Sequence, residues 1–331
     1  MPINISEIRP PLTGIKLIEA LSQKHERRPA LAEGFLYEHT ITMIAADPGL
    51  GKSTIATQVA VELSAGLPVF GVFNVPKPIR VLYIQAERSI IEILERLDII
   101  NKIIPIVKEN LYITDAYQSF NLVNHDHVNA FIKCIKRDCP NIEFIILDPI
   151  YAMVAGGLSN DLPASAFTKA MSRLQVETRA GIWYSHHTIK QQHTRDGLAI
   201  EKEDPFYGSQ WLKAHVTGSY YMKKHENGVK LICKKDNYNL LVKSIHLDYD
   251  PETELCSIPT SEISALERVK NFIKMREIDQ KEFTFSQIKD SVEVCNKTLR
   301  YTLQHPEVIN KIIVVNIIKR KHLYKAKKQA F

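Results

Sequence analysis

The fold of this chain is decided by one stretch, ITMIAADPGLGKST at residues 41–54. Its first six residues have the apolar character of a buried strand, and a helical pattern begins directly after the glycines. A strand, a glycine-containing turn and a helix in this order form a phosphate-binding loop. Ala46 stands at the first position of the motif, where Gly is commoner. The stretch therefore predicts an α/β domain that binds nucleotide phosphates.

The backbone and the side chains of this loop both supply phosphate ligands. Gly49 and Gly51 allow backbone conformations in which successive N–H groups turn toward phosphate oxygens, and the following helix adds its positive end. We expect Lys52 to reach the β and γ phosphates and the Ser53 hydroxyl to bind Mg²⁺. ATP and Mg²⁺ are thus the expected cofactors. The expected nucleotide-binding residues are Ala46, Asp47, Pro48, Gly49, Leu50, Gly51, Lys52, Ser53 and Thr54.

Apolar runs alternate with helical segments on both sides of the loop. Strands are expected at residues 41–46, 81–85, 111–114, 144–147 and 181–184, with helices at 54–64, 90–103, 127–137 and 164–178. Continuous apolar strands between amphipathic helices indicate a parallel sheet covered on both faces. Further strands at 218–222, 229–234, 242–247 and 255–258, with a hairpin turn at Glu226-Asn227-Gly228, predict an antiparallel extension of this sheet.

Two acidic residues follow buried strands at the expected nucleotide edge. Asp148 ends the apolar run at 144–147, where a carboxylate is needed to hold the magnesium together with Ser53. Glu87 follows the strand at 81–85, 35 residues beyond Lys52. Right-handed winding brings that strand end to the edge that carries the phosphate loop. We therefore expect Glu87 to act as the general base that activates water.

Two adjacent histidines, His186 and His187, follow the strand at 181–184. Neighbours on a strand point to opposite faces, so joint metal ligation is not expected. A neutral histidine hydrogen-bonded to phosphate is the favoured interpretation, and the spacing does not choose between the two.

Four segments, ADPGLGKSTIATQVA, LYIQAE, FIILDPI and YSHHTIK, resemble the RecA-like ATPases and most closely the RepA-type hexameric helicases of plasmids and phages. The resemblance covers about residues 30–258. It implies an ATP-dependent DNA helicase or translocase that forms a hexamer and moves on single-stranded DNA. It also implies that Glu87 activates the hydrolytic water and that the histidine segment senses the γ phosphate. The catalytic residues would be Glu87, Lys52, His186, His187, Lys234 and Lys235.

The two lysines belong to the segment Lys234-Lys235-Asp236-Asn237-Tyr238, which resembles the family element that completes the active site of a neighbouring subunit. Either lysine fits the family spacing. Asp236 stands where relatives have a second basic residue. Residues 153–163 and 189–207 leave the nucleotide edge as candidate pore loops, and Lys190 and Arg195 of the second loop are expected to contact DNA.

The last 71 residues carry the basic excess of the chain. Residues 261–331 hold 15 Lys and Arg against 8 Asp and Glu, whereas the whole chain has a net charge of +6. Three short helices followed by strands predict a winged helix that contacts duplex DNA or a replication protein. Its expected nucleic-acid residues are Lys297, Arg300, Lys319, Arg320 and Lys321. The expected domains are an arm at 1–38, the ATPase at 39–259 and the winged helix at 260–331.

Composition excludes several other classes of protein. A chain of 331 residues that is 45% hydrophobic and 24% charged is globular, without a membrane span or secretory signal. Its five cysteines form no CxxC pair, so reduced thiols and a cytoplasmic location are expected. Two alternative functions stay open: an ATP-switched DNA-binding regulator, and a helicase loader or recombination ATPase that does not unwind.

Overall fold

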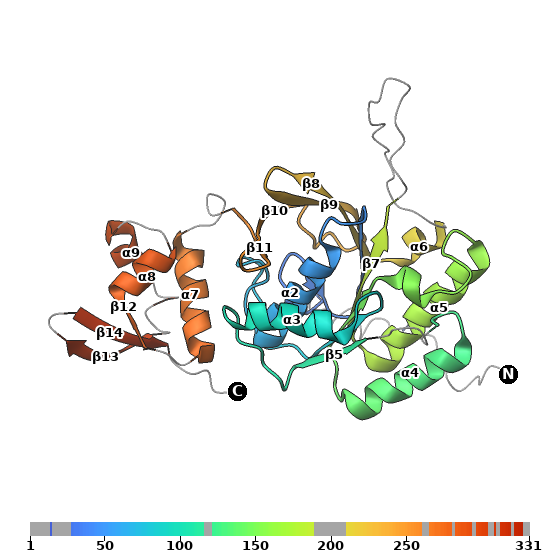
Figure 1. Ribbon diagram of the computed structural model, residues 1–331, viewed down its shortest axis with the longest axis horizontal. Coiled ribbons are helices and arrows are strands. Elements are labelled where there is room, and N and C mark those ends of the chain that lie inside the picture. The colour runs from blue at the N-terminus through green and yellow to red at the C-terminus, as the bar shows by residue number, and fades with distance from the viewer. Residues whose placement is uncertain are drawn as a thin grey trace, which may run out of the picture.

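The computed structural model describes residues 14, 28–115, 121–188, 210–259, 265–279, 282–292, 296–303, 308, 312–318 and 321–326. They form a large body built on one sheet and a smaller C-terminal body (Figure 1). None of the described helices combines the length and the apolar character that crossing a membrane requires.

The large body is organised around a nine-stranded sheet with the order β11-β10-β9-β8-β3-β7-β6-β4-β5. The strands from β5 to β8 in this order run parallel, and β9, β10 and β11 run antiparallel to their neighbours. The strand bounds are β3 (Ile41–Ala46), β4 (Val81–Gln85), β5 (Leu111–Asp115), β6 (Phe144–Asp148), β7 (Gly181–His187), β8 (Gly218–His225), β9 (Gly228–Asp236), β10 (Ser244–Asp250) and β11 (Leu255–Ser257).

One strand of the expected antiparallel extension is parallel instead. β8 pairs with β3 in parallel, with Gly218 opposite Thr42, and only β9 reverses the direction. The chain between β7 and β8 is long enough to cross back to the starting edge of the sheet, which a parallel pairing requires. The predicted turn at 226–228 is confirmed as the β8–β9 hairpin. A Cβ atom at Gly228 would lie 2.0 Å from the carbonyl oxygen of Leu247, so the close approach of β10 requires glycine there.

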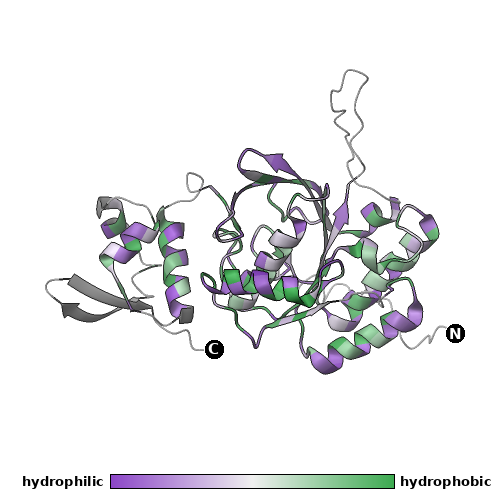
Figure 2. Ribbon diagram, viewed as in Figure 1, coloured by the Kyte–Doolittle hydropathy of each residue, from purple (hydrophilic) through white to green (hydrophobic). Residues whose placement is uncertain are grey.

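Helices cover both faces of the parallel part, which explains why its strands are apolar at consecutive positions. Side chains of Ile44 and Ala46 face one core and those of Met43 and Ala45 face the other. The first core includes α2 (Lys52–Ala65) and α3 (Ile90–Asn101), and the second includes α4 (His125–Asp138), α5 (Asp161–Thr178) and α6 (Gln210–His215). Figure 2 shows hydrophilic and hydrophobic residues alternating along α4, as expected for a helix with one buried face.

Part of the segment that the sequence assigned to an N-terminal arm packs into the first core. β1 (Ala30–Ala32) and β2 (Leu36–Tyr37) form a small antiparallel sheet. Phe35 between them is fully buried and contacts the rings of Phe73, Trp183 and Tyr220. The expected boundary at residue 38 therefore follows two strands that belong to this core. The helix expected near residues 14–23 lies outside the described residues apart from Gly14.

The C-terminal body has a separate apolar core. Its elements are α7 (Ala265–Asp279), β12 (Phe283–Thr284), α8 (Phe285–Val292), α9 (Asn296–Leu303), β13 (Ile312–Ile318) and β14 (Lys321–Ala326). The strands form an antiparallel sheet with the order β12-β14-β13. α7 contacts the large body, since Lys274 Nζ donates to the Val75 carbonyl at 2.8 Å and Asn271 donates to the Gly71 carbonyl.

Candidate active site

The phosphate loop joins β3 to α2 in the expected place. Gly49 and Gly51 have φ values of 80° and 87°, a left-handed region in which glycine is favoured, and Gly51 is the N-cap of α2. A Cβ atom built at Gly49 would meet no atom within 4 Å, so the loop is open on that side. An open glycine loop before a helix N-terminus fits the phosphates of a nucleotide.

Lys52 lies where β3 and β7 end. Its Nζ atom donates to the carbonyl oxygens of Ala46 at 2.9 Å and Asp47 at 3.1 Å, and its side chain is buried. Burial lowers the pKa of Lys52, and the negative charges of Asp148, Glu87 and Asp47 partly oppose this change. The structure therefore brings the predicted phosphate lysine together with both predicted acidic residues.

Asp148 at the end of β6 is fully buried and held by two hydroxyl groups. Tyr83 donates to Oδ2 at 3.0 Å, and Ser185 donates to Oδ1. Tyr83 lies on β4 and Ser185 on β7, the two strands that flank β6. Both hydroxyls leave the carboxylate free to accept further bonds on its remaining lone pairs, as a ligand in the hydration shell of Mg²⁺ must do.

Polar contacts connect the two predicted magnesium residues through Thr57 and Tyr83. Thr57 Oγ1 donates to the Ser53 carbonyl at 2.8 Å and lies 3.4 Å from the Tyr83 hydroxyl, which in turn contacts Asp148. Sequence reasoning missed Tyr83, Thr57 and Ser185. Tyr83 and Ser185 are polar residues inside otherwise apolar strands, and that interruption is the signal that could have identified them.

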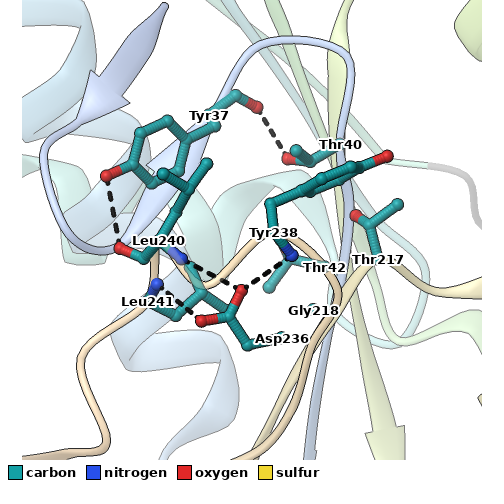
Figure 3. Close-up of a pocket in the computed structure, with 9 residues that line it drawn as sticks. All are labelled: Tyr37, Thr40, Thr42, Thr217, Gly218, Asp236, Tyr238, Leu240 and Leu241. Atoms are coloured by element: carbon teal, nitrogen blue, oxygen red, sulfur yellow. Dashed lines mark hydrogen bonds between the residues drawn. The ribbon is translucent and has the colours of Figure 1, made fainter. Parts of the chain in front are cut away.

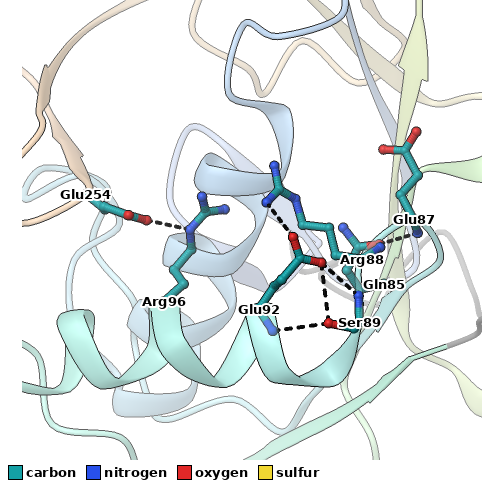
Figure 4. A network of polar contacts seen from close by, with 7 residues as sticks. All are labelled: Gln85, Glu87, Arg88, Ser89, Glu92, Arg96 and Glu254. Atoms are coloured by element: carbon teal, nitrogen blue, oxygen red, sulfur yellow. Dashed lines mark hydrogen bonds and ion pairs between the residues drawn. The ribbon is translucent and has the colours of Figure 1, made fainter.

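Glu87 follows β4, and hydrogen bonds from the backbone to the Gln85 side chain fix its position (Figure 4). Its N–H donates to Gln85 Oε1 at 2.5 Å, and the N–H of Arg88 donates to the same atom at 3.0 Å. A capping box between Ser89 and Glu92 then starts α3. In Figure 4 the carboxylate of Glu87 points away from this network.

The charge state of Glu87 is altered by its surroundings. Burial raises the pKa of the Glu87 carboxyl, the nearby Asp148 raises it further, and Lys52 opposes the change. A carboxylate with a raised pKa is a better proton acceptor than an exposed glutamate. The position and the electrostatics of Glu87 thus both suit a general base.

His186 and His187 both lie on β7, which extends to residue 187. Because side chains alternate between the two faces of a strand, the two histidines point to opposite faces of the sheet. Nδ1 of His187 lies 3.4 Å from Nζ of Lys52. The His187 ring contacts that of Tyr151 in the short 3-10 helix η2 (Ile150–Met153), with ring centroids 4.6 Å apart and ring planes tilted by 39°. Burial lowers the pKa of His187, and the charge of Lys52 lowers it further. His186 is 1% exposed. Of the contacts described for the two histidines, the one with the phosphate lysine is made by His187.

The two candidate trans lysines also differ. The pairing of β8 with β9 shifts register between Ser219 and Tyr220, which face Lys235 and Cys233, so Lys234 is the extra residue of a β-bulge. Lys234 is exposed. Lys235 instead donates to the carbonyl oxygens of Lys213 at 2.7 Å and Ala214 at 3.0 Å, at the end of α6.

Asp236 organises the loop after β9 rather than contributing a cation (Figure 3). Its carboxylate accepts bonds from the backbone N–H groups of Tyr238, Leu240 and Leu241 at 3.2, 3.2 and 2.9 Å. Tyr238 in turn packs beneath Arg28, whose Cζ atom lies 4.3 Å from the ring centroid. The pocket in Figure 3 lies where β3 and β8 begin, opposite the phosphate loop, so it is separate from the nucleotide site.

The remaining predicted DNA residues are only partly described. Lys190, Arg195, Lys319 and Arg320 lie outside the described residues. Lys297 and Lys321 lie on α9 and β14, where only the backbone is described, and Arg300 is exposed on α9. Within the described ranges, no group of three or more His, Cys, Asp or Glu residues is arranged to hold a metal ion.

A parallel sheet with this phosphate loop, a buried strand-end aspartate and a strand-end glutamate defines the class of P-loop ATPases. The family model of the AAA domain, AAA_25, matches residues 9–193, which is more than half of the chain. The chain belongs to this family. No curated protein matches the sequence.

Solved structures with a similar fold include an isolated ATPase domain and a replicative helicase. The ATPase domain superposes with a TM-score of 0.54 at 14% identity, over 74% of this chain and 96% of that chain. "The Structure Of A DnaB-Like Replicative Helicase And Its Interactions With Primase" has the same TM-score and identity, over 73% of this chain and 66% of that chain. These matches show that the large body has the RecA-like fold of helicase ATPase domains.

Proposed function

We propose that this chain is a Mg²⁺-dependent, ATP-driven DNA helicase of the RepA type, which forms a hexamer and moves on single-stranded DNA in plasmid or phage replication. The observation that carries the proposal is the meeting of Lys52, Asp148, Glu87 and His187 at one edge of the sheet. The likeness to the fold of the isolated ATPase domain and of the DnaB-like helicase supports the helicase assignment.

Each residue of the site has a separate role in the proposed hydrolysis of ATP. The phosphate loop and Lys52 bind the β and γ phosphates. Ser53 and Asp148 would hold a magnesium ion, which would supply charge neutralisation at the phosphates. Glu87 orients a water molecule and accepts its proton as the water attacks the γ phosphorus. His187 is neutral and can hydrogen-bond both to Lys52 and to the γ phosphate, so it can report whether that phosphate is present.

The proposed ring follows from Lys234. Its side chain is exposed in the bulge of β9, level with the start of β8, whereas the phosphate loop follows the other end of β3, so Lys234 lies apart from its own nucleotide site. Neither Lys234 nor Lys235 is among the charges that shift the pKa of Lys52, Glu87 or His187. An exposed cation of this kind suits the phosphates bound by a neighbouring subunit, and a ring of such head-to-tail interfaces completes every site.

The C-terminal body is proposed to contact duplex DNA or a replication protein as a winged helix. The order helix, strand, helix, helix, strand, strand and the three-stranded antiparallel sheet support this assignment. α9 would be the recognition helix, since it presents Arg300 to solvent. The strands β13 and β14 would form the wing.

Unwinding of a forked duplex by the purified chain tests the helicase proposal. The wild-type protein is expected to unwind with ATP, and Glu87→Gln is expected to bind ATP without unwinding. Glu95→Gln is the matched control, because Glu95 is an exposed glutamate of α3 away from the site. ATP hydrolysis stimulated by single strands without unwinding would favour a loader or recombination ATPase. Hydrolysis insensitive to single strands would favour a DNA-binding regulator switched by ATP.

A further inference from the structure

Gln85 is a buried polar residue at the end of β4. All five residues of this strand are buried, and Gln85 is 0% exposed. Tyr83 faces the first core, whereas Leu82 and Ile84 face the second. Because side chains alternate along a strand, Gln85 lies on the face of Tyr83, which α2 covers. In the register of the sheet Gln85 lies directly beside Asp148 on β6, whose carboxylate accepts the hydrogen bond of Tyr83. Gln85 therefore shares the edge of the sheet with the predicted magnesium aspartate.

The side-chain amide of Gln85 uses its oxygen but not its nitrogen. Oε1 accepts the N–H groups of Glu87 and Arg88 at 2.5 and 3.0 Å. The buried Nε2 group has no hydrogen-bond partner in the part of the chain that the structure describes. Rotating the amide by 180° would turn its NH₂ group toward two N–H donors, so the backbone fixes its orientation. A buried donor without a partner destabilises a fold, and stability therefore does not account for a glutamine here.

The turn after β4 depends on this one side chain. The N–H group of Ala86 donates to a carbonyl oxygen of β6 at 2.9 Å and continues the sheet. The N–H group of Ser89 belongs to the capping box that starts α3. The two N–H groups between them, those of Glu87 and Arg88, both donate to Gln85. Gln85 thus holds the only stretch of this turn that neither the sheet nor the helix holds.

The Glu87 carboxylate has no polar partner of its own. Among the described residues, no hydrogen bond or ion pair holds its oxygen atoms. In Figure 4 the backbone N–H of Glu87 is tied to Gln85 while the carboxylate points away from the network. The direction of the carboxylate is therefore set by the backbone of the turn.

We propose that Gln85 is a positioning residue for ATP hydrolysis, which aims the general base by holding the Glu87 backbone through Oε1. The proposal rests on the proposed role of Glu87, and it does not depend on DNA or on a ring. A base that is displaced by about 1 Å from its water can lose roughly 10²-fold in rate. Gln85 does not contact the nucleotide in this role, so it acts on kcat and not on binding.

Gln85→Met tests the proposal, because methionine keeps the length of the side chain and removes the amide. This variant is expected to lower kcat by roughly 10²-fold with little change in the Kd for ATP. Partial burial and the nearby Asp148 raise the pKa of the Glu87 carboxyl. A carboxylate released into solvent has a lower pKa, so the acid side of the pH profile of kcat should move to lower pH. Gln85→Leu repeats the test if Gln85→Met does not fold.

A double variant shows whether Gln85 acts through Glu87. Gln85→Met/Glu87→Gln is expected to hydrolyse ATP no more slowly than Glu87→Gln alone, because there is no base left to aim. Independent roles would instead multiply the two losses, and that result would overturn the proposal.

The conservative variant Gln85→Asn is expected to restore most of kcat and the wild-type pH profile. Asparagine can accept the same two N–H groups, as Asn124 does at the start of α4. The Asn124 side chain accepts the N–H groups two and three residues further on, those of Asp126 and His127, at 2.9 and 3.2 Å. A Gln85→Asn variant as slow as Gln85→Met would contradict a role of the amide oxygen.

Gln58→Met is the matched control for a purely structural glutamine. Gln58 is also buried, and its Oε1 atom accepts the N–H group of Cys256 at 2.7 Å. This variant should lower the melting temperature without moving the pH profile of kcat. A wild-type kcat and pH profile in Gln85→Met, beside an inactive Glu87→Gln, would overturn the role of Gln85 alone. Hydrolysis by Glu87→Gln at the wild-type rate would overturn the proposed base and this proposal together.

Discussion

The Nζ atom of Lys52, the first residue of α2, lies 3.4 Å from Nδ1 of His187, the last residue of β7. A neutral imidazole can accept a hydrogen bond from the Lys52 ammonium, whereas a protonated one would place two positive charges side by side. Burial and the charge of Lys52 both lower the pKa of His187, so the imidazole is neutral at physiological pH. The pair connects the lysine that binds phosphate to the last residue of β7.

His187→Ala is expected to lower the rate of ATP hydrolysis by roughly 10²-fold or more, the typical effect of removing one polar group that contacts the reacting phosphate. Nucleotide affinity should change little. His186→Ala is expected instead to lower the free energy of unfolding by about 1–3 kcal/mol, because His186 is 1% exposed. Phosphate release and thermal unfolding of both variants check this difference. Equal effects of the two substitutions on the hydrolysis rate would contradict it.

Glu87→Gln is expected to lower kcat by roughly 10²–10⁴-fold with little change in the Kd for ATP, because the amide cannot accept the proton of the attacking water. The wild-type rate should fall as the pH drops through the pKa of Glu87. Burial and Asp148 raise that pKa, so the fall should occur at a higher pH than an exposed glutamate would give. Rates measured from pH 5 upward check the profile, and hydrolysis by Glu87→Gln at the wild-type rate would refute the assignment of the base.

Mixed assemblies distinguish a trans role of Lys234 from a role within its own subunit. Lys52→Ala removes the phosphate lysine but keeps Lys234, and Lys234→Ala does the reverse. Each variant alone is expected to be almost inactive. An equal mixture should regain part of the hydrolysis rate, because some interfaces then combine an intact phosphate loop with an intact Lys234. A mixture that is no more active than its parts would exclude the trans role.

Lys235→Ala is expected to lower the stability of the protein and not the rate of ATP hydrolysis. Its ammonium group holds the last carbonyl oxygens of α6 at 2.7 and 3.0 Å, and its pKa is lowered by burial. Loss of these bonds should lower the melting temperature by a few degrees, since hydrogen bonds from charged groups contribute about 1.5–3 kcal/mol. Thermal unfolding of Lys235→Ala, compared with that of Lys234→Ala, checks the prediction. A mixture of Lys235→Ala with Lys52→Ala should show no regain of activity beyond the sum of its parts.

Glu62 makes stability depend on pH. Burial raises the pKa of this α2 carboxyl to about 8, although Gln58 Nε2 and the Phe70 N–H donate to it at 2.8 and 2.9 Å. The folded state therefore holds the proton more tightly than the unfolded state. The stabilising contribution is complete below pH 4.5, the ordinary pKa, and is lost as the pH rises to about 8. The slope in this window should be about −1.4 kcal/mol per pH unit for this group.

Glu62→Gln removes the titrating proton while keeping the shape of the neutral carboxyl. The pH dependence of unfolding between pH 5 and 8 should become flatter by this slope, measured with urea at each pH. Glu95→Gln on the exposed face of α3 is the control and should leave the slope unchanged. A Glu62→Gln variant with the wild-type pH dependence would show that this carboxyl does not hold its proton in the folded state.

Deletion of residues 261–331 tests the proposed winged helix. The full chain is expected to bind duplex DNA with a steep salt dependence, because this segment carries the basic excess. The shortened chain should lose that binding and keep basal ATP hydrolysis, because the nucleotide site lies entirely in the large body. Arg300→Gln in the full chain is the milder test on α9. Duplex binding that survives the deletion unchanged would refute the DNA role of the tail.

Local sequence predicted the strands and helices of the parallel sheet to within a few residues, because each has its own apolar pattern and β3, α2 and the phosphate loop form one continuous stretch. The expectation that β8 joins the sheet as part of the antiparallel extension was wrong, because β8 pairs with β3 in parallel. The direction of a strand depends on where the preceding crossover returns the chain to the sheet. The supports of Asp148 were missed for a related reason: Tyr83, Ser185 and Asp148 are distant in the chain and meet only through strand order.

The sequence by itself determined that this chain has a phosphate loop and which acidic residues end the neighbouring strands, because these features depend on spacing along one segment of backbone. Only the tertiary structure shows that His187 contacts Lys52 and that Lys235, unlike the exposed Lys234, is bonded to the end of α6. The face of a strand and the position of a bulge follow from register with a partner strand, and register is set by packing between residues far apart in the chain.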